Sequence, residues 1–223
     1  MIVVGLTGSI GMGKSTASAT LRRMGVALFD ADQVVHRLLA PGGGAVTKVE
    51  AAFPGTRAEN GGIDRKKLGA RVFGDPQALA RLEAILHPMV AQAEKRFLAA
   101  ARARREPIAV LDIPLLYEAR GAARCDYVIV VSAPAMVQRQ RVMRRPGMTE
   151  ARFAAILQQQ MSDTEKRRRA DFVVPTGLDR GLSLRHLRVI VRFLQTQARR
   201  PRRQTCRPIF RQSIHPLSSQ RPR

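Results

Sequence analysis

The strongest constraint on the fold is the segment Gly8–Ser15, which reads GSIGMGKS and fits the phosphate-binding pattern G-x-x-x-x-G-K-[ST] without a mismatch. A short apolar run over residues 1–6 precedes it, and residues 16–21 have the composition of a helix. A strand, a glycine loop and a helix in this order form the context in which backbone N–H groups surround a phosphate chain. The segment therefore predicts a nucleoside triphosphate site. The alternative, a plain glycine-rich turn, is disfavoured by the four specified positions.

The residue types in this loop suit their expected tasks. Glycines at 8, 11 and 13 allow the backbone to approach phosphates closely, because they carry no Cβ. Lys14 supplies a cation for the terminal phosphates, and the Ser15 hydroxyl suits Mg²⁺.

Apolar runs and helical segments alternate along the rest of the chain. Further strands are expected at residues 26–29, 108–111, 127–131 and 172–174. Helices are expected at 33–39, 135–144, 150–168 and 182–197, and residues 45–105 are mostly helical, with a loop at 54–64 and an interruption at Pro88. Five short strands separated by helices predict an α/β fold whose parallel sheet is covered on both faces.

Carboxylates follow two of the expected strands. Asp30 and Asp32 end the second strand, and Asp112 ends the third. Because ligands of parallel sheets bind beyond the carboxyl ends of the strands, we expect these residues to meet the glycine loop there. Asp30 and Asp32 have the same parity at a strand end, so they could point to one side. Asp32 could accept a proton from a hydroxyl acceptor, Asp30 could be structural or a partner of metal-bound water, and Asp112 could hold Mg²⁺. Each carboxylate could instead cap the helix that follows it.

A basic helix precedes the Pro146-Gly147 break. Gln138, Arg141 and Arg145 share one face of it. Such a face suits a lid whose arginines close over a phosphate, although a solvated basic face is the alternative. His87 has no His or Cys nearby that could complete a metal site, so a helix-capping or a substrate-pocket role remains open for it.

Composition limits the remaining classes of protein. Cys125 and Cys206 are too few for a disulfide framework, and no apolar stretch approaches the roughly 18 residues that span a bilayer. No signal peptide precedes the loop, so a cytoplasmic protein is expected. The net charge is +22, and residues 198–223 contain eight arginines and no acidic residue. We interpret that tail as a disordered, solvated appendage. Without it, 31 basic residues still face 17 acidic ones, which suits a polyphosphate enzyme or a nucleic-acid-binding protein.

Five segments together resemble the dephospho-coenzyme A kinase family. They are VGLTGSIGMGKST at residues 4–16, FDADQVVHRL at 29–38, LGARVFGDPQALARLEAILHPMV at 68–90, DIPLLYE at 112–118 and ADFVV at 170–174. The resemblance covers residues 2–197 and leaves out the tail. The family often has Gly and Ser where Ser9 and Met12 stand, but we expect neither side chain to matter, because the loop works through backbone amides. The family often has Asn in place of Thr176, so no adenine contact is assigned there.

The resemblance implies a kinase core with a helical acceptor-binding insert at about residues 40–105 and a small lid at about 138–168. It implies ATP-dependent, Mg²⁺-dependent phosphorylation of the ribose 3′-hydroxyl of dephospho-coenzyme A. Asp32 is then the general base, with Lys14 and Arg141 also catalytic. The implied ATP-binding residues are Gly8, Gly11, Met12, Gly13, Lys14, Ser15, Thr16 and Arg145. The implied acceptor-binding residues are Asp32, Arg37, His87, Asp112 and Leu115. Ser15 and, through water, Asp112 would hold the metal.

Three rival functions share part of this pattern. A GTPase is disfavoured because Asn60 is the single asparagine and no Asn-Lys-x-Asp motif occurs. Another small-metabolite kinase fits the loop and Asp32, but not the segments 68–90 and 112–118 together. A specific nucleic-acid-binding protein is disfavoured because aromatic residues are only 4% of the chain, too few for stacking platforms. The sequence does not indicate an oligomeric state.

Overall fold

The computed structural model describes residues 1–177 and 179–199. Its strands are β1 (Ile2–Thr7), β2 (Ala27–Asp30), β3 (Ile108–Asp112), β4 (Tyr127–Ser132) and β5 (Phe172–Pro175). Its helices are α1 (Lys14–Arg23), α2 (Ala31–Leu39), α3 (Val46–Ala52), α4 (Arg65–Val72), α5 (Pro76–Ala103), the 3₁₀ turn η1 (Gly121–Arg124), α6 (Ala135–Met143), α7 (Glu150–Gln158), α8 (Asp163–Arg169) and α9 (Arg180–Arg199).

The five strands form one parallel sheet in the order β2-β3-β1-β4-β5, as the sequence predicts. The central strands β1, β3 and β4 are buried along almost their whole length, which explains why their sequences are continuous apolar runs. Leu6 of β1 and Asp30 of β2 both lie opposite Asp112 of β3. The carboxyl ends of β1, β2 and β3 therefore meet at one edge of the sheet.

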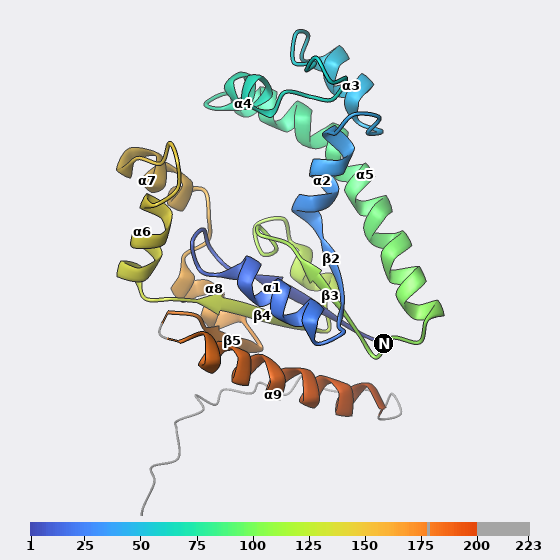
Figure 1. Cartoon of the computed structure of the whole chain (residues 1–223), viewed down its shortest axis with the longest axis vertical. Helices are drawn as coiled ribbons and strands as arrows, with labels where there is room; N and C mark the ends of the chain where they lie inside the picture. The colour runs from blue at the N-terminus through green and yellow to red at the C-terminus, as the bar shows by residue number, and fades with distance from the viewer. Residues whose placement is uncertain (178, 200–223) are drawn as a thin grey trace, which may run out of the picture.

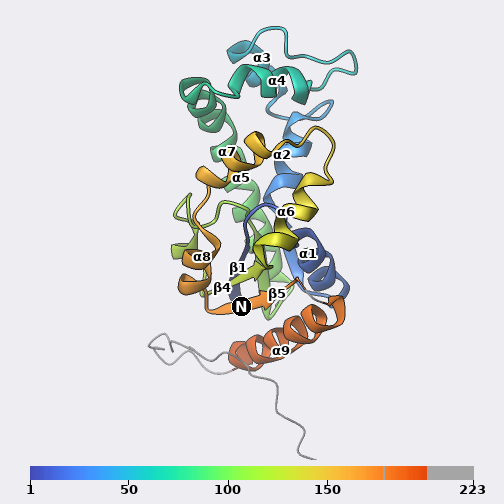
Figure 2. The same cartoon turned by 90° about the vertical axis from the view of Figure 1, so that its left-hand side faces the viewer.

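Helices cover both faces of this sheet (Figure 1). On one face, α1 and α9 pack against β1, β3 and β4 through an apolar cluster that includes Leu21, Leu187 and Leu194. On the other face, the second half of α5 contributes Phe97, which contacts Phe29 of β2 with ring centroids 5.6 Å apart. Figure 2 shows α9 at one end of the molecule, with α3 and α4 at the other.

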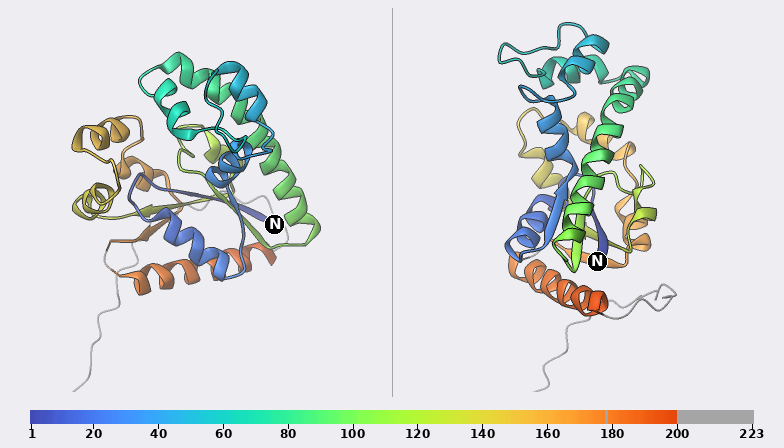
Figure 3. Two further views of the ribbon diagram at one scale, coloured as in Figure 1. Left: turned by 45° about the horizontal axis from the view of Figure 1, so that its top comes forward. Right: turned by 90° about the vertical axis from the view of Figure 1, so that its right-hand side faces the viewer.

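A second apolar core lies away from the sheet. Residues of α3, α4 and the first half of α5 pack together, among them Val49, Leu68 and Leu82. Figure 3 shows α5 running from this cluster down to the sheet. Asp64 and Asp75 cap α4 and α5 by accepting hydrogen bonds from the first free N–H groups. This part of the chain is the segment for which an acceptor-binding insert was expected.

Three expectations about helices are corrected by the structure. Pro88 does not interrupt the helix, since α5 continues through it. Proline leaves the Ala84 carbonyl without its helical hydrogen-bond partner, but Pro88 and Ala84 both face solvent, where water can take that place. The helix expected at 150–168 is divided into α7 and α8, because the Ser162 side chain caps a new helix start. Finally, α9 continues to Arg199, two residues into the expected tail, while the disorder expected for 200–223 lies outside the described residues.

In the described part of the chain, no helix has both the length and the apolar composition needed to cross a membrane.

Candidate active site

The phosphate loop (Gly8–Ser15) joins β1 to α1, as expected from its pattern. Gly11 and Gly13 have φ angles of 76° and 88°, in the left-handed region that favours glycine. A Cβ at Gly8 would lie 2.5 Å from a methyl carbon of Val131 and 2.7 Å from its carbonyl oxygen. All three glycines are therefore required by the shape of the loop.

The Met12 side chain has a structural role, although the sequence predicted that it would not matter. It is 2% exposed and belongs to the apolar core under α1 and α9. Its sulfur accepts a hydrogen bond from the Ala133 N–H at 3.1 Å. The expectation that this side chain does not matter is therefore wrong, since Met12 anchors the loop to the start of the chain segment after β4.

Lys14 connects the loop to two carboxylates. Its ammonium lies 2.8 Å from Oδ1 of Asp112 and 4.0 Å from Oδ2 of Asp32. Asp112 is only 2% exposed, and it also accepts a hydrogen bond from the Ser18 hydroxyl. Burial raises the pKa of Asp112 above its ordinary value, although Lys14 and Ser18 act in the opposite direction. The expected meeting of Lys14, Asp32 and Asp112 is confirmed.

Asp30 and Asp32 have different surroundings. The strand ends at Asp30 and α2 begins at Ala31, so the two side chains do not share a strand face. Asp30 caps α2 by accepting the Gln33 N–H at 2.9 Å, and Arg22 donates to it at 2.9 Å. Burial alone would raise the pKa of Asp30, but these two hydrogen bonds and Lys14 hold it below its ordinary value. Asp32 is 71% exposed and stays free for chemistry beside Lys14.

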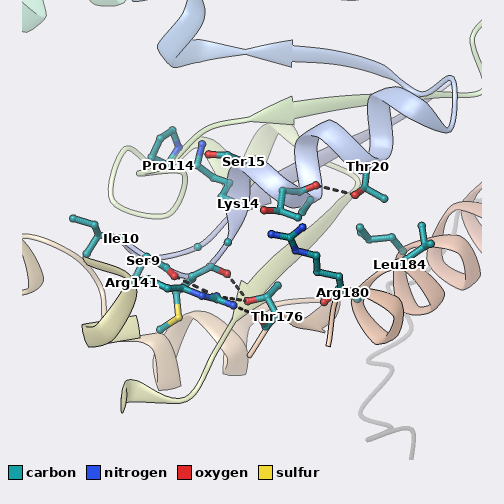
Figure 4. Close-up of a pocket in the computed structure, with 18 of the residues that line it drawn as sticks. Ser9, Ile10, Lys14, Ser15, Thr20, Pro114, Arg141, Thr176, Arg180 and Leu184 are labelled. Atoms are coloured by element: carbon teal, nitrogen blue, oxygen red, sulfur yellow. Dashed lines mark hydrogen bonds between the residues drawn. The ribbon is translucent and has the colours of Figure 1, made fainter. Parts of the chain in front are cut away.

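The loop borders two clefts. The larger cleft has a volume of about 970 Å³ and runs from the phosphate loop to the start of α9, past Thr16, Arg141, Arg145, Thr176 and Arg180. Figure 4 shows Lys14, Arg141, Thr176 and Arg180 around it. The smaller cleft, about 340 Å³, lies toward β2 and α4. Lys14, Ser15 and Asp32 line both clefts, so these residues form the boundary between them.

The basic face of α6 is directed at the loop, as the helical spacing predicted. Arg141 donates to the Thr176 carbonyl at 2.6 Å and lies near the Gly11 carbonyl, while Arg145 lines the larger cleft. The Thr176 hydroxyl donates to the Met12 carbonyl at 2.6 Å. The sequence analysis assigned no adenine contact to Thr176, because the family often has Asn at this position; the contact of its hydroxyl with the loop carbonyl was not expected.

Three residues expected to bind the acceptor do not reach either cleft. Arg37 is exposed on α2, and Leu115 is 42% exposed in the loop after β3, where its neighbour Pro114 lines the larger cleft. His87 is an exposed residue in the middle of α5. A mid-helix position also excludes the capping role that was left open for His87, because its own backbone groups lie within the helix.

Two residues that sequence reasoning missed do line the smaller cleft. Arg65, the first residue of α4, lies 3.0 Å from Nδ1 of His36 on α2. This contact joins the insert to α2, and it places a guanidinium in the same cleft as Asp32. The two residues are 29 positions apart, so no local pattern could have paired them.

The oxygen groups near Lys14 are suited to Mg²⁺. The hydroxyl-bearing Ser15 lines both clefts, and the carboxylate of Asp112 lies at the bottom of the smaller one. Residues 1–177 and 179–199 contain no group of three or more His, Cys, Asp or Glu that could hold a metal alone. Mg²⁺ in kinases is usually bound by one or two protein oxygens together with phosphates. Ser15 and Asp112 therefore fit an ion that enters with a nucleotide.

Comparisons with known proteins identify related sequences and structures. The family model described as dephospho-CoA kinase matches residues 2–178. The chain is 54% identical over 209 residues to the dephospho-CoA kinase of Rhodospirillum rubrum, covering 93% of this chain and 99% of that one. It is 59% identical over 177 residues to the enzyme of the same name from Mesorhizobium japonicum, covering 79% and 88%.

Solved structures share the fold. The crystal structure of TT1252 from Thermus thermophilus has a TM-score of 0.73 and 33% identity, and the match covers 86% of this chain and 97% of that one. Dephospho-CoA kinase from Campylobacter jejuni has a TM-score of 0.60 at 23% identity, covering 86% and 96%. With a family match over most of its length and relatives above 50% identity, the chain belongs to the dephospho-CoA kinase family.

Proposed function

We propose that the chain transfers the γ-phosphoryl group of ATP to the ribose 3′-hydroxyl of dephospho-coenzyme A, giving coenzyme A and ADP in the final step of coenzyme A biosynthesis. The observation that carries this proposal is the boundary of Lys14, Ser15 and Asp32 between two clefts. Phosphoryl transfer needs two substrates whose reacting atoms meet at one point. A donor in the larger cleft and an acceptor in the smaller one would meet there.

The larger cleft is the donor side. Its loop amides and the N-terminus of α1 favour the phosphates of ATP. Lys14 would hold the β- and γ-phosphates, and Arg141 of α6 and Arg145 just after it would approach them. Residues from about 138 to 168 then act as the lid, and the region from about residue 40 to 105 acts as the acceptor-binding insert.

Asp32 is the general base in this proposal. Its carboxylate takes the proton of the 3′-hydroxyl while that oxygen bonds to the γ-phosphorus. The bond from the γ-phosphorus to the β–γ bridging oxygen breaks, and the electron pair stays with ADP. Asp32 suits this role because it is exposed and borders both clefts. Arg65 and His36 line the acceptor side and would bind the phosphate groups of dephospho-coenzyme A.

Mg²⁺ would be held by Ser15 and, through water, by Asp112. When bound, this ion offsets the negative charge of the β- and γ-phosphate oxygens. Asp112 also keeps the Lys14 ammonium at the boundary of the two clefts. We place this activity in the cytoplasm, in keeping with a biosynthetic role.

The test is an acceptor panel with purified protein, ATP and Mg²⁺. Formation of coenzyme A and ADP from dephospho-coenzyme A, with little ADP from shikimate, gluconate or pantothenate, is the expected result. A preference for one of the other acceptors would refute the proposed substrate. Duplex DNA in the same assay at physiological salt serves as the control for the high positive charge, and no effect on the rate is expected.

A further inference from the structure

We propose that Gln138 and Gln160 are positioning residues that tie the tip of the phosphate loop to both ends of the segment 135–160. This inference rests on the proposed kinase activity, for which the loop must hold ATP. Segment 135–160 contains α6 and α7, with the basic residues that face the larger cleft. Through the two glutamines, the position of this segment and the shape of the loop depend on each other.

Both backbone groups of one loop residue are held by these glutamines. The Ile10 N–H donates to Oε1 of Gln160 at 3.1 Å, and Nε2 of Gln138 donates to the Ile10 carbonyl at 2.8 Å. The bonds join residues 150 and 128 positions apart. A glutamine amide can accept or donate, so one residue type can make both bonds. Ile10 is thus held from two sides, directly before the left-handed Gly11.

The start of the segment packs directly on the loop. Gln138 is buried, with 6% of its surface exposed. A Cβ at Gly11 would lie 2.6 Å from a methyl carbon of Val142 and 3.0 Å from the Gln138 carbonyl. There is no space between α6 and the loop at this point. Figure 4 shows Ile10 and Ser9 at the same end of the loop as Arg141. A shift of α6 must therefore move the loop or break these contacts.

The other end of the segment is fixed to the sheet. Next to Gln160, the Met161 N–H donates to Glu118 at 2.8 Å, and Glu118 also pairs with the buried Lys166 of α8 at 2.9 Å. Ser132 at the end of β4 donates to Asp163 at 2.7 Å. Gln160 therefore extends from a rigid attachment point. Its bond to the Ile10 N–H therefore links the loop to this attachment point.

The experiment combines hydrogen exchange with kinetics. Protein labelled with ¹⁵N-isoleucine reports exchange of the Ile10 amide by NMR. Gln160→Met removes the acceptor and should speed this exchange at least about tenfold, whereas Gln160→Glu retains an acceptor oxygen and should preserve protection. Gln159→Met, at the exposed neighbouring position, is the matched control and should leave the exchange unchanged. Unchanged Ile10 exchange in Gln160→Met would overturn the proposal.

The kinetic arm tests the consequence for ATP. Gln138→Met and Gln160→Met should each raise KM for ATP by about 3- to 10-fold, the range of one lost hydrogen bond, with KM for dephospho-coenzyme A unchanged. The double variant should have a KM for ATP no higher than about that of the more impaired single variant, because both bonds hold one residue. Gln140→Met is the exposed control on α6. Fully multiplicative effects, or no change in KM for ATP, would overturn the coupling. If the wild type does not phosphorylate dephospho-coenzyme A, the proposed function is refuted. The Ile10 exchange experiment still tests whether Gln160 holds the loop, because it does not depend on the acceptor.

Discussion

Replacing Asp32 by Asn separates the two tasks that this carboxylate could perform. The substitution keeps the size of the side chain and removes its charge and basicity. Asp32 lies 4.0 Å from the Lys14 ammonium and is 71% exposed. It could therefore act only as an electrostatic partner of Lys14, or it could take the proton of the acceptor hydroxyl. The two roles predict different losses of rate.

The geometry bounds the electrostatic role. Two unit charges 4 Å apart attract by about 1 kcal/mol in water, and exposed ion pairs are usually worth about 0–1 kcal/mol. Asp32 is 71% exposed, so solvent screens the pair even though Lys14 is only 15% exposed, and a loss of about 1 kcal/mol would slow the reaction about fivefold. Loss of a general base instead lowers the rate by about 10²- to 10⁴-fold, equivalent to about 2.7–5.4 kcal/mol. We therefore expect Asp32→Asn to lower kcat by about 10²-fold or more, with a small effect on stability.

The assay is a single-turnover measurement of coenzyme A formation at saturating ATP, Mg²⁺ and dephospho-coenzyme A. Asp30→Asn is the matched control, two residues away. Asparagine caps helices as well as aspartate does, so α2 should keep its start and the rate should stay within about threefold of wild type. A fall of less than about fivefold in Asp32→Asn, or an equal fall in both variants, would show that Asp32 is not the base.

Three other changes test separate parts of the site and fold. Arg65→Met should raise KM for dephospho-coenzyme A about 10-fold but leave KM for ATP unchanged in steady-state assays, whereas the exposed control Lys67→Met should change neither. Gly8→Ala should abolish ATP binding measured by calorimetry, because its Cβ would lie 2.7 Å from a carbonyl oxygen of β4; normal affinity would contradict this. Burial raises the pKa of Glu94 above 4.5 despite Arg124, so its ionised form disfavours folding. In urea unfolding, the stability of wild type should fall relative to Glu94→Gln as the pH rises above about 4.5, and the two should converge below it; the opposite slope would contradict the sign.

Much of the donor site could be predicted because its signals are local. The loop pattern specifies its own conformation, and the rule for parallel sheets brings Asp32 and Asp112 to Lys14 without knowledge of any side chain. The sequence alone did not decide whether the Asp30 carboxylate takes part in catalysis or caps α2, since a carboxylate before a helix suits both roles. Only its bond to the Gln33 N–H decides for the cap.

The acceptor side could not be predicted to the same depth. Arg65 reaches the site because α4 folds back over α2, and this depends on apolar packing among α3, α4 and α5. Arg37 and His87 lie in segments that resemble the family, yet they face solvent. The position of a residue within a motif does not show whether its side chain faces the site or solvent, when both faces of the helix carry polar residues. Gln138 was noted only as part of a basic face, and Gln160 was not noted at all.

Two residues of the phosphate loop, Ile10 and Lys14, make separate contacts. This separation allows segment 135–160 to be coupled to ATP binding through the backbone of the loop. Ile10 is bonded to the two ends of segment 135–160, while Lys14 is bonded to Asp112 at the boundary of the two clefts. The ion pair restrains a lysine side chain whose rotamer freedom is worth about 2 kcal/mol, so a phosphate that binds Lys14 has less disorder to remove. Lys14 is already placed, so the part of the ATP affinity that the loop amides would supply depends on the shape of the backbone around Gly11 and Gly13. That shape is held through Ile10, so segment 135–160 can influence ATP binding without any direct contact between Gln138 and the nucleotide.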